Sequence, residues 1–459
     1  MSMYKEISFL EIIIVFAVTI TGIGMGIVLF ETALIGLILG IFVSGVICSR
    51  NGYQISQLWQ MIKMGTSNAK GILMIMSLIG MLSASWMLSG TIAAMMNIGF
   101  DYLTRMNALL AFFIVTTIIS LILGTSIGSI SVIGISFMEI GTSMGIPPAM
   151  IAGAVVSGAY IGDRTSPISS SANLTASITG TNIMENIKVM MTTLWPVVLL
   201  CIGFYYWLGR EYILTEQSIN HINNVQQLLS GYYTIGWYTY LPPILLMGGA
   251  IFRFPILYCI LIGLISSMGI SFFTTDLTIA QMLETLILGY QPENGEISKI
   301  ISGAGWISML NVILIILFST ALNGILEHTK MIKPLIDIFS KKIKDAKELV
   351  FKTSVLCIGI NAITCNQSLS IIIPGKFLKE QYQEKGLTKN ELARTIADSG
   401  VVTVALLPWN VNALAIVAIL GVNTLDYAPY ALIPYLLPIA TVIYPHVQKP
   451  RLTQKEEAA

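Results

Sequence analysis

Long apolar runs follow one another along this chain of 459 residues, separated by short polar segments. Most of them approach the roughly 20 residues that a helix needs to cross a bilayer. Backbone polar groups in lipid must be bonded within their own segment, so we expect helices rather than strands. The pattern predicts an all-α polytopic membrane protein with about 11–13 membrane segments. The runs lie near residues 9–29, 32–48, 71–97, 105–123, 190–208, 233–251, 254–272, 301–325, 353–373, 397–420 and 430–446.

Composition agrees with this pattern. Hydrophobic residues make up 55% of the chain and charged residues 11%, whereas soluble domains carry about a quarter charged residues. The net charge is +1, which offers no basic face for a nucleic-acid partner. The five cysteines form no CxxC pair and the three histidines are isolated, so we predict no metal site built from cysteine or histidine. The first apolar run lacks a cleavage motif, so we interpret it as a retained span.

Basic and acidic residues are distributed differently among the loops. Lysine and arginine gather at residues 50–70, at residues 330–352 and after residue 446, whereas the loops at 209–232 and 273–300 are acidic. Basic loops stay on the cytoplasmic side of a membrane. We therefore expect a cytoplasmic N-terminus, with both acidic loops outside. The lysine-rich segment Ile336–Lys352 has helical apolar spacing, so it either lies along the inner membrane surface or is a solvated loop.

Two polar stretches about half the chain apart resemble each other. Residues 124–173 and 364–412 both pass through a phenylalanine, a glycine turn, a Ser-Gly pair, a proline and an asparagine, about 240 residues apart. The alternative is that apolar helices rich in Gly and Ser align easily. The match predicts a first transmembrane half at 1–208, a polar connector at 209–232 and a second half at 233–459.

The stretch GAYIGDRTSPISSSANLTA, at 158–176, interrupts this apolar chain with charge. Proline and hydroxyl side chains break helices, and a break at membrane depth is tolerated where it lines a protein or watery cavity. An intramembrane carboxylate is functional by default. We predict a broken helix that binds an ion or solute, with sodium at Asp163 and Asn173; the alternative is that Asp163 and Arg164 only pair with neighbouring helices. The predicted binding residues are Asp163, Arg164, Ser166, Ser169, Ser170 and Asn173.

Two polar patches in the second half complete the candidate site. The first, at 364–376, offers the amides of Asn366 and Gln367 and predicts another broken helix. The second, at 391–412, places Arg394 and Asp398 four residues apart, which is the spacing of an ion pair on one helix face. That pair has two interpretations, a role in transport or simple helix stabilisation.

Glu139 interrupts an apolar run of the first half. A carboxyl group in an apolar environment can exchange protons near neutral pH. We therefore interpret Glu139 as a candidate proton carrier. The alternative is a glutamate at the end of a span that faces water.

At these motifs the sequence resembles the NhaC-type sodium/proton antiporter family, which includes a malate/lactate exchanger. The matching motifs are GTSIG from Gly124, SGAYIGDRTSPISSSANL from Ser157, LSIIIPGKF from Leu369 and LARTIADSGVVTVALLPWN from Leu392. The resemblance implies a secondary active antiporter of the bacterial plasma membrane, with two inverted repeats, alternating access and a homodimer. It implies sodium and protons as coupling ions and no cofactor. It also assigns Asp398, Ser399 and Asn410 to the site, beside Gln367.

The sequence departs from the family at two site positions. Typical members have acids where this chain has Ser170 and Asn366, and Glu139 stands where a small residue is expected. Loss of two acids weakens plain sodium/proton exchange and favours, as an alternative, coupled exchange of a small organic acid or amino acid. No intramembrane histidine, HExxH or GxSxG motif supports an enzyme. Duplicated broken helices also favour alternating access over a passive channel.

Overall fold

The computed structural model describes residues 7–447, except 31, 68, 104–105, 168, 213–215, 253 and 332–342. In these residues nearly all regular structure is helical, as predicted. The first half contains α1 Phe9–Phe30, α2 Leu34–Arg50, α3 Ile55–Ser67, α4 Lys70–Leu88, α5 Thr91–Leu103, α6 Ala108–Leu123, α7 Ser126–Ser143, α8 Pro148–Thr165, α9 Ser170–Thr179, α10 Ile183–Gly209 and η1 Arg210–Tyr212.

The predicted polar connector is mostly the helix α11 Glu216–Tyr232. The second half then contains η2 Trp237–Tyr240, α12 Leu241–Ile251, α13 Ile256–Thr274, α14 Ile279–Leu288, α15 Gly295–Ile300, η3 Ile307–Met309, α16 Leu310–His328, α18 Ala346–Thr364, α19 Gln367–Phe377, α20 Lys379–Glu384, α21 Lys389–Ile396, η4 Ala397–Val401, η5 Thr403–Leu406, α22 Val411–Leu420, α23 Thr424–Tyr427, η6 Ala428–Tyr430 and α24 Leu432–Val447. Element η4 is a π-helical turn.

The chain is an integral membrane protein. Within the described residues, six helices are long and apolar enough to cross a bilayer, and two further helix pairs qualify as bent spans. One bent pair, residues 389–406 with 411–420, changes direction by 50°. Three shorter apolar helices, α2, α6 and α14, add to the bundle.

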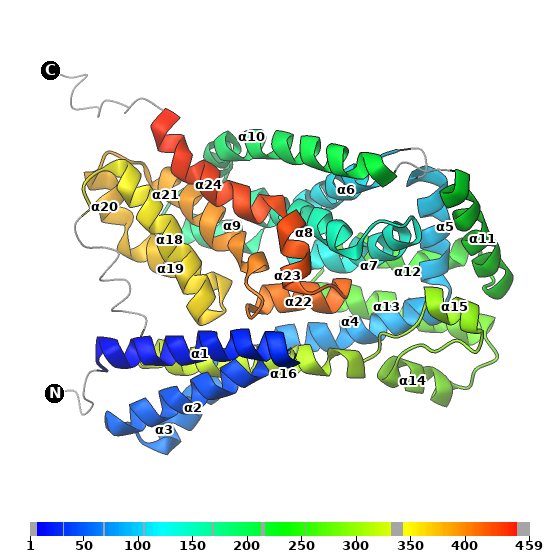
Figure 1. Cartoon of the computed structure of the whole chain (residues 1–459), viewed down its shortest axis with the longest axis horizontal. Coiled ribbons are helices and arrows are strands. Elements are labelled where there is room, and N and C mark those ends of the chain that lie inside the picture. The colour runs from blue at the N-terminus through cyan, green and yellow to red at the C-terminus, as the bar shows by residue number, and fades with distance from the viewer. Residues whose placement is uncertain are drawn as a thin grey trace.

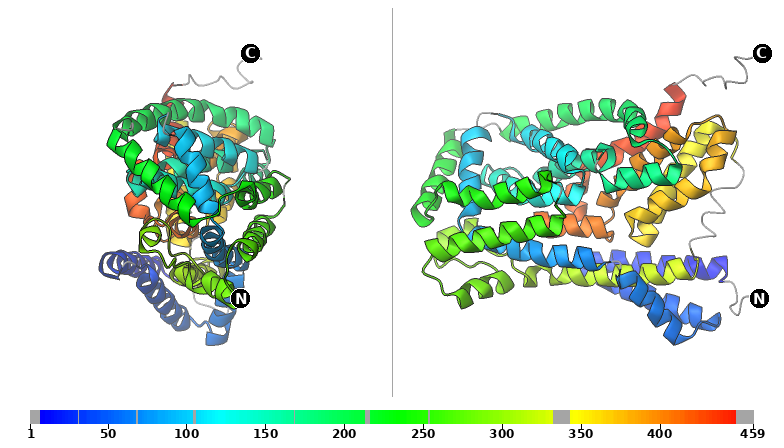
Figure 2. Two further views of the ribbon diagram at one scale, coloured as in Figure 1. Left: turned by 90° about the vertical axis from the view of Figure 1, so that its right-hand side faces the viewer. Right: turned by 180° about the vertical axis from the view of Figure 1, so that it is seen from behind.

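Most helices run along the longest axis and form two layers (Figure 1). One layer contains α1–α4, α13 and α16, and the other contains α6–α10 and α18–α24 (Figure 2). Within the first layer α16 packs on α2 and α3, while α4 packs on α13. Helix α22 contacts both α4 and α16, so it joins the layers.

The two halves repeat the same backbone features at a constant separation along the chain. Glycines with positive φ recur at Gly145 and Gly386 and, with the same separation, as the helix C-caps Gly180 and Gly421. We call this separation the repeat offset. Packing repeats too: α9 of the first half packs on α19, and its counterpart α22 packs on α7, the counterpart of α19.

The second half runs in the opposite direction to the first. Helix α6 begins beside the end of α10 near the connector, whereas its counterpart α18 begins at the opposite end, beside α20 (Figure 1). The halves are therefore inverted repeats.

Several predicted apolar runs are interrupted. The run at 71–97 is two helices that meet at Gly90, where φ is +71°. The runs at 353–373 and 397–420 break at residues 365–366 and 407–410. The predicted spans do not include helix α7, because its many serines and glycines lower the hydropathy of this segment. It is nevertheless long and apolar enough to cross a bilayer.

The structure describes only part of the lysine-rich segment Ile336–Lys352, for which the sequence left a surface helix and a solvated loop open. Residues 332–342 lie outside the described part of the chain, and from Ala346 onward the segment is the first turns of α18. The lysines at the C-terminal end of this segment therefore lie in the first turns of α18 rather than in a separate helix on the membrane surface.

Candidate functional site

Asp163 lies in the last turn of α8, with its side chain buried. Two neutral groups donate to Oδ2 of the carboxylate, Ser126 Oγ at 3.0 Å and Gln367 Nε2 at 3.4 Å. Ser169 Oγ donates mainly to the backbone carbonyl oxygen of Asp163 and lies 3.3 Å from Oδ1. Among the described residues Asp163 takes part in no ion pair. A buried carboxylate without a countercharge is costly unless a ligand or a proton joins it.

The donors to Asp163 come from equivalent places in the two repeats. Ser126 and Gln367 are the first residues of α7 and α19, are related by the repeat offset, and reach the same oxygen, Oδ2. That oxygen therefore lies where the inverted halves meet. The counterpart of Asp163 itself is Val404, so this pair of positions supplies one carboxylate only.

Helix N-termini surround this carboxylate. Helices α7 and α19 begin at the two donors, and Ser169 is the N-cap of α9, where its hydroxyl also accepts from the Ala172 amide. The N-terminal end of a helix carries a partial positive charge of about half a unit. Three such ends favour negative charge at Asp163 and in any ligand beside it.

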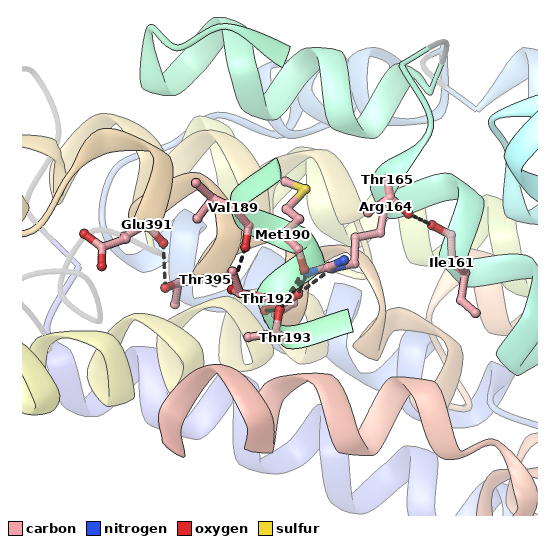
Figure 3. Close-up of polar contacts among 10 residues, drawn as sticks. Ile161, Arg164, Thr165, Val189, Met190, Thr192, Thr193, Glu391 and Thr395 are labelled. Carbon is pink, nitrogen blue, oxygen red and sulfur yellow. Dashed lines mark hydrogen bonds and ion pairs between the residues drawn. The ribbon is translucent and has the colours of Figure 1, made fainter. Parts of the chain in front are cut away.

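Arg164, the next residue, points away from Asp163 into a separate buried cluster. Its guanidinium donates to the Met190 carbonyl oxygen at 3.0 Å and to Thr193 Oγ1 at 2.9 Å (Figure 3). It also forms an ion pair with the Asp398 carboxylate. Thr193 also donates to Asp398 at 2.9 Å. Arg164 and Asp398 are fully buried and come from opposite halves, so the pair ties the two repeats together.

The predicted Arg394–Asp398 ion pair is not formed, since Asp398 bonds Arg164 instead. Asp398 lies in the π-helical turn η4, where the wider winding displaces side chains from the four-residue register. Arg394 is buried with its guanidinium 4.0 Å from the ring centre of Tyr444, and its Nε and Nη1 have no hydrogen-bond partner among the described residues.

The remaining residues predicted in the first broken helix lie around Asp163 but do not contact it. Ser166 is turned toward α6 and donates to the Leu121 carbonyl oxygen at 2.8 Å. Ser170 and Asn173 are exposed on one face of α9. The Asn173 amide bonds the carbonyl oxygens of Pro167 and Ser169 at 2.9 and 2.7 Å, which fixes the break.

The predicted second-half residues mostly stabilise helix ends. Asn366 caps α19 and Asn410 caps α22. Asn410 also donates to the Asn361 carbonyl oxygen at 3.3 Å. Ser399 is fully buried in η4, and its hydroxyl has no hydrogen-bond partner in the described residues.

Glu139 lies far from this site. It is half-buried on α7, near the opposite end of the helix from Ser126. At the usual helical rise, this separation places Glu139 about 20 Å along the helix from the carboxylate contact. Glu139 therefore does not lie beside Asp163, and its role in proton transfer stays a prediction.

Three polar residues of the site escaped the sequence analysis: Ser126, Thr193 and Asn361. Ser126 had an available signal, because the repeat offset pairs it with the predicted Gln367, whereas Asn361 pairs with Ser120, which was not predicted either. Thr193 had none, since only the packing of α10 brings it to Asp398.

The chain is similar to known transporters. The model of the Na+/H+ antiporter family matches residues 158–447, which include Asp163 and all of the second-half site. The chain belongs to this family. It is 28% identical to the Na+/H+ antiporter NhaC of Alkalihalophilus pseudofirmus, over 81% of this chain and 80% of that protein. It is 30% identical to NhaC of Bacillus subtilis, over 84% of this chain and 86% of that protein.

Another relative exchanges amino acids. The arginine/ornithine antiporter ArcD of Halobacterium salinarum is 30% identical over 96% of this chain and 92% of that protein. As a member of the Na+/H+ antiporter family the chain is a transporter and not an enzyme. The two positions at which it lacks the acids expected for the NhaC type, Ser170 and Asn366, directly adjoin the residues that bond Asp163, namely Ser169 and Gln367.

Proposed function

We propose that the chain is a secondary active antiporter that exchanges sodium for protons at Asp163. The single observation that supports this most is the Asp163 carboxylate, which is buried between the halves and bonded by neutral groups only. Such a carboxylate gains either a proton or a cation, but not both, and this competition couples the two fluxes. Arg164 does not neutralise Asp163, because Asp398 occupies it.

Alternating access fits the arrangement of the repeats. The breaks between α8 and α9, between α18 and α19 and between η5 and α22 all lie in the layer that contains Asp163, and this layer packs on a second layer of continuous helices. Inverted repeats of this kind expose one central site to each side in turn. We propose that the layer with the broken helices carries the site.

The ends of the molecule support a cytoplasmic N-terminus in the plasma membrane of a bacterium. Helices α11, α14 and α15, with their acidic residues, lie at one end of the long axis, and α20 and the described ends of the chain lie at the other (Figure 1). Basic segments favour the cytoplasmic side. A reporter fused after residue 459 tests this: we expect activity of a cytoplasmic reporter, and activity of a periplasmic reporter would reverse the orientation.

Transport by purified protein in liposomes tests the main proposal. We expect sodium added outside to release internal protons, and Asp163→Asn to abolish this exchange while the thermal unfolding temperature changes little. Asn keeps the shape of the side chain but cannot ionise. Ser131→Ala is the matched control, because Ser131 bonds only the Ile127 carbonyl oxygen of its own helix. Normal exchange by Asp163→Asn would contradict the proposal.

A second candidate function is coupled exchange of a small amino acid or organic acid. It is favoured by Ser170 and Asn366, which leave the N-termini of α9 and α19 without the acids expected for the NhaC type. The three helix ends can bind a solute carboxylate, and Asp163 can bind an amino group. ArcD shows that a relative exchanges amino acids. Uptake of labelled amino and organic acids into the same liposomes, at zero sodium gradient, separates this function from sodium/proton exchange.

A further inference from the structure

The two repeats use the same hydrogen bond to hold their broken helices. In the first half Ser120 Oγ donates to the Ala159 carbonyl oxygen. In the second half Asn361 Nδ2 donates to the Gly400 carbonyl oxygen at 2.8 Å. The repeat offset relates both the two donors and the two acceptors. Any difference between these two positions is therefore a difference in chemistry rather than in fold.

The difference lies in one oxygen atom. The Ser120 hydroxyl is fully used, because it also accepts from the Gly162 amide at 3.0 Å. The Asn361 amide uses its Nδ2 on Gly400 and on Thr403 Oγ1, at 3.2 Å. These acceptors fix the orientation of the amide, since Oδ1 would repel the Gly400 carbonyl oxygen. Asn361 Oδ1 is left fully buried, without a hydrogen-bond partner among the described residues.

A second unpaired oxygen lies on the neighbouring turn. Ser399 stands where the first half has Gly158, and its Oγ is fully buried without a partner in the described part of the chain. A side chain at Gly158 would meet the Phe113 carbonyl oxygen of α6 at 2.7 Å. The second half accommodates the hydroxyl that the first half cannot.

Two carbonyl oxygens belong to the residues that directly follow Ser399 in η4. The Gly400 and Val401 carbonyl oxygens already receive Ser370 Oγ at 3.1 Å and Gln367 Nε2 at 2.9 Å. A buried polar group without a partner costs about 1–3 kcal/mol. The two residues with unpaired oxygens both adjoin Gly400, Asn361 through its hydrogen bond and Ser399 along the chain, and hard cations prefer oxygen ligands. Gln367 also contacts Asp163, so the negative charge of Asp163 lies one side chain away.

We propose that Asn361 and Ser399 form a second, uncharged sodium site in the second half, distinct from the carboxylate at Asp163. This rests on the proposed function only in taking sodium as the transported ion. A site without an ionisable ligand binds sodium without competition from protons. Its affinity is therefore independent of pH, whereas sodium binding at Asp163 weakens as the pH falls.

Sodium-dependent thermal stabilisation of the purified full-length protein tests the second site. Sodium chloride is compared with potassium and choline chloride, at pH 6 and pH 8, in the Asp163→Asn background. We expect a sodium-specific stabilisation that is equal at both pH values. Two substitutions are then added singly to Asp163→Asn: Ser399→Ala, which removes the hydroxyl, and Asn361→Ser, which restores the residue of the first half. Each is expected to lower the apparent sodium affinity at least tenfold.

Three outcomes overturn the second site. They are loss of all sodium-specific stabilisation in Asp163→Asn, unchanged affinity in both double variants, or a strong pH dependence of the remaining binding. Unchanged affinity would mean that only water satisfies the two oxygens. Failure of the proposed function has a different result: sodium binding survives in Asp163→Asn, but wild-type liposomes show no sodium/proton exchange.

Discussion

The two buried aspartates near the middle of the molecule are held in opposite ways. Asp398 bonds the guanidinium of Arg164 and the hydroxyl of Thr193. Asp163, one residue from that arginine, receives only hydroxyl and amide donors. A charge with its countercharge is a fixed part of the structure, whereas one with neutral donors can exchange protons and ions. We therefore propose that Asp398 serves stability and that Asp163 serves transport.

The largest expected effect is on stability. Asp398→Asn leaves Arg164 charged and buried without its partner, so we expect the free energy of unfolding to fall by about 3–5 kcal/mol. Thermal unfolding of the detergent-purified protein measures this. Asp163→Asn is the control, because it removes no ion pair, and its unfolding temperature should stay near that of the wild type. Equal destabilisation by both variants would remove the distinction between the aspartates.

Replacing the whole ion pair sharpens the same point. Arg164→Met with Asp398→Leu removes both buried charges together, and such replacements are often neutral. We expect the double variant to recover most of the loss and to unfold within about 1 kcal/mol of the wild type. The measurement is a double-mutant cycle of thermal stability. A double variant as unstable as Asp398→Asn would show that packing around the pair, rather than its charge, determines stability.

The two donors from equivalent helix starts should contribute alike to ion binding. Ser126→Ala and Gln367→Ala each remove one hydrogen bond to Asp163 Oδ2. A hydrogen bond to a charged group contributes about 1.5 kcal/mol or more, which is roughly a tenfold change in affinity. We expect each variant to raise the sodium concentration for half-maximal exchange by about tenfold. An effect of one variant alone would place the ion away from the boundary between the halves.

The sequence could predict the charged residue of the site but not its partners. Asp163 stands out because an acid in an apolar chain has a cost that demands an explanation. Ser126 and Asn361 do not, since single hydroxyls and amides are common in membrane helices and usually bond their own backbone. For Ser126 the repeat contained the missing information, because the glycine turns at Gly145 and Gly386 define the repeat offset that pairs it with the predicted Gln367.

The ion-pair partner of Asp398 could not be predicted from sequence patterns. The four-residue rule assumes a regular helix, and the π-helical turn at 397–401 breaks that regularity. Choosing Arg164 over Arg394 also requires knowing that α8 and α10 pack beside η4. The fold class followed from the apolar runs and the composition, but helix breaks such as the one at Gly90 depend on local backbone conformation that hydropathy does not record.

The smallest expected effect concerns the turns that precede α7 and α19. Gly124 and Cys365 are equivalent C-caps, both in the left-handed region, with φ of +66° and +54°. Glycine adopts this conformation freely, whereas a residue with a Cβ pays about 1–2 kcal/mol. We expect Cys365→Gly to raise the free energy of unfolding by about 1 kcal/mol, with Cys201→Ala as a control for removing a buried thiol elsewhere. Gly124→Ala should lower the free energy of unfolding by a similar amount. A loss of stability in Cys365→Gly would mean that packing of the Cys365 thiol stabilises the protein by more than its left-handed backbone conformation costs.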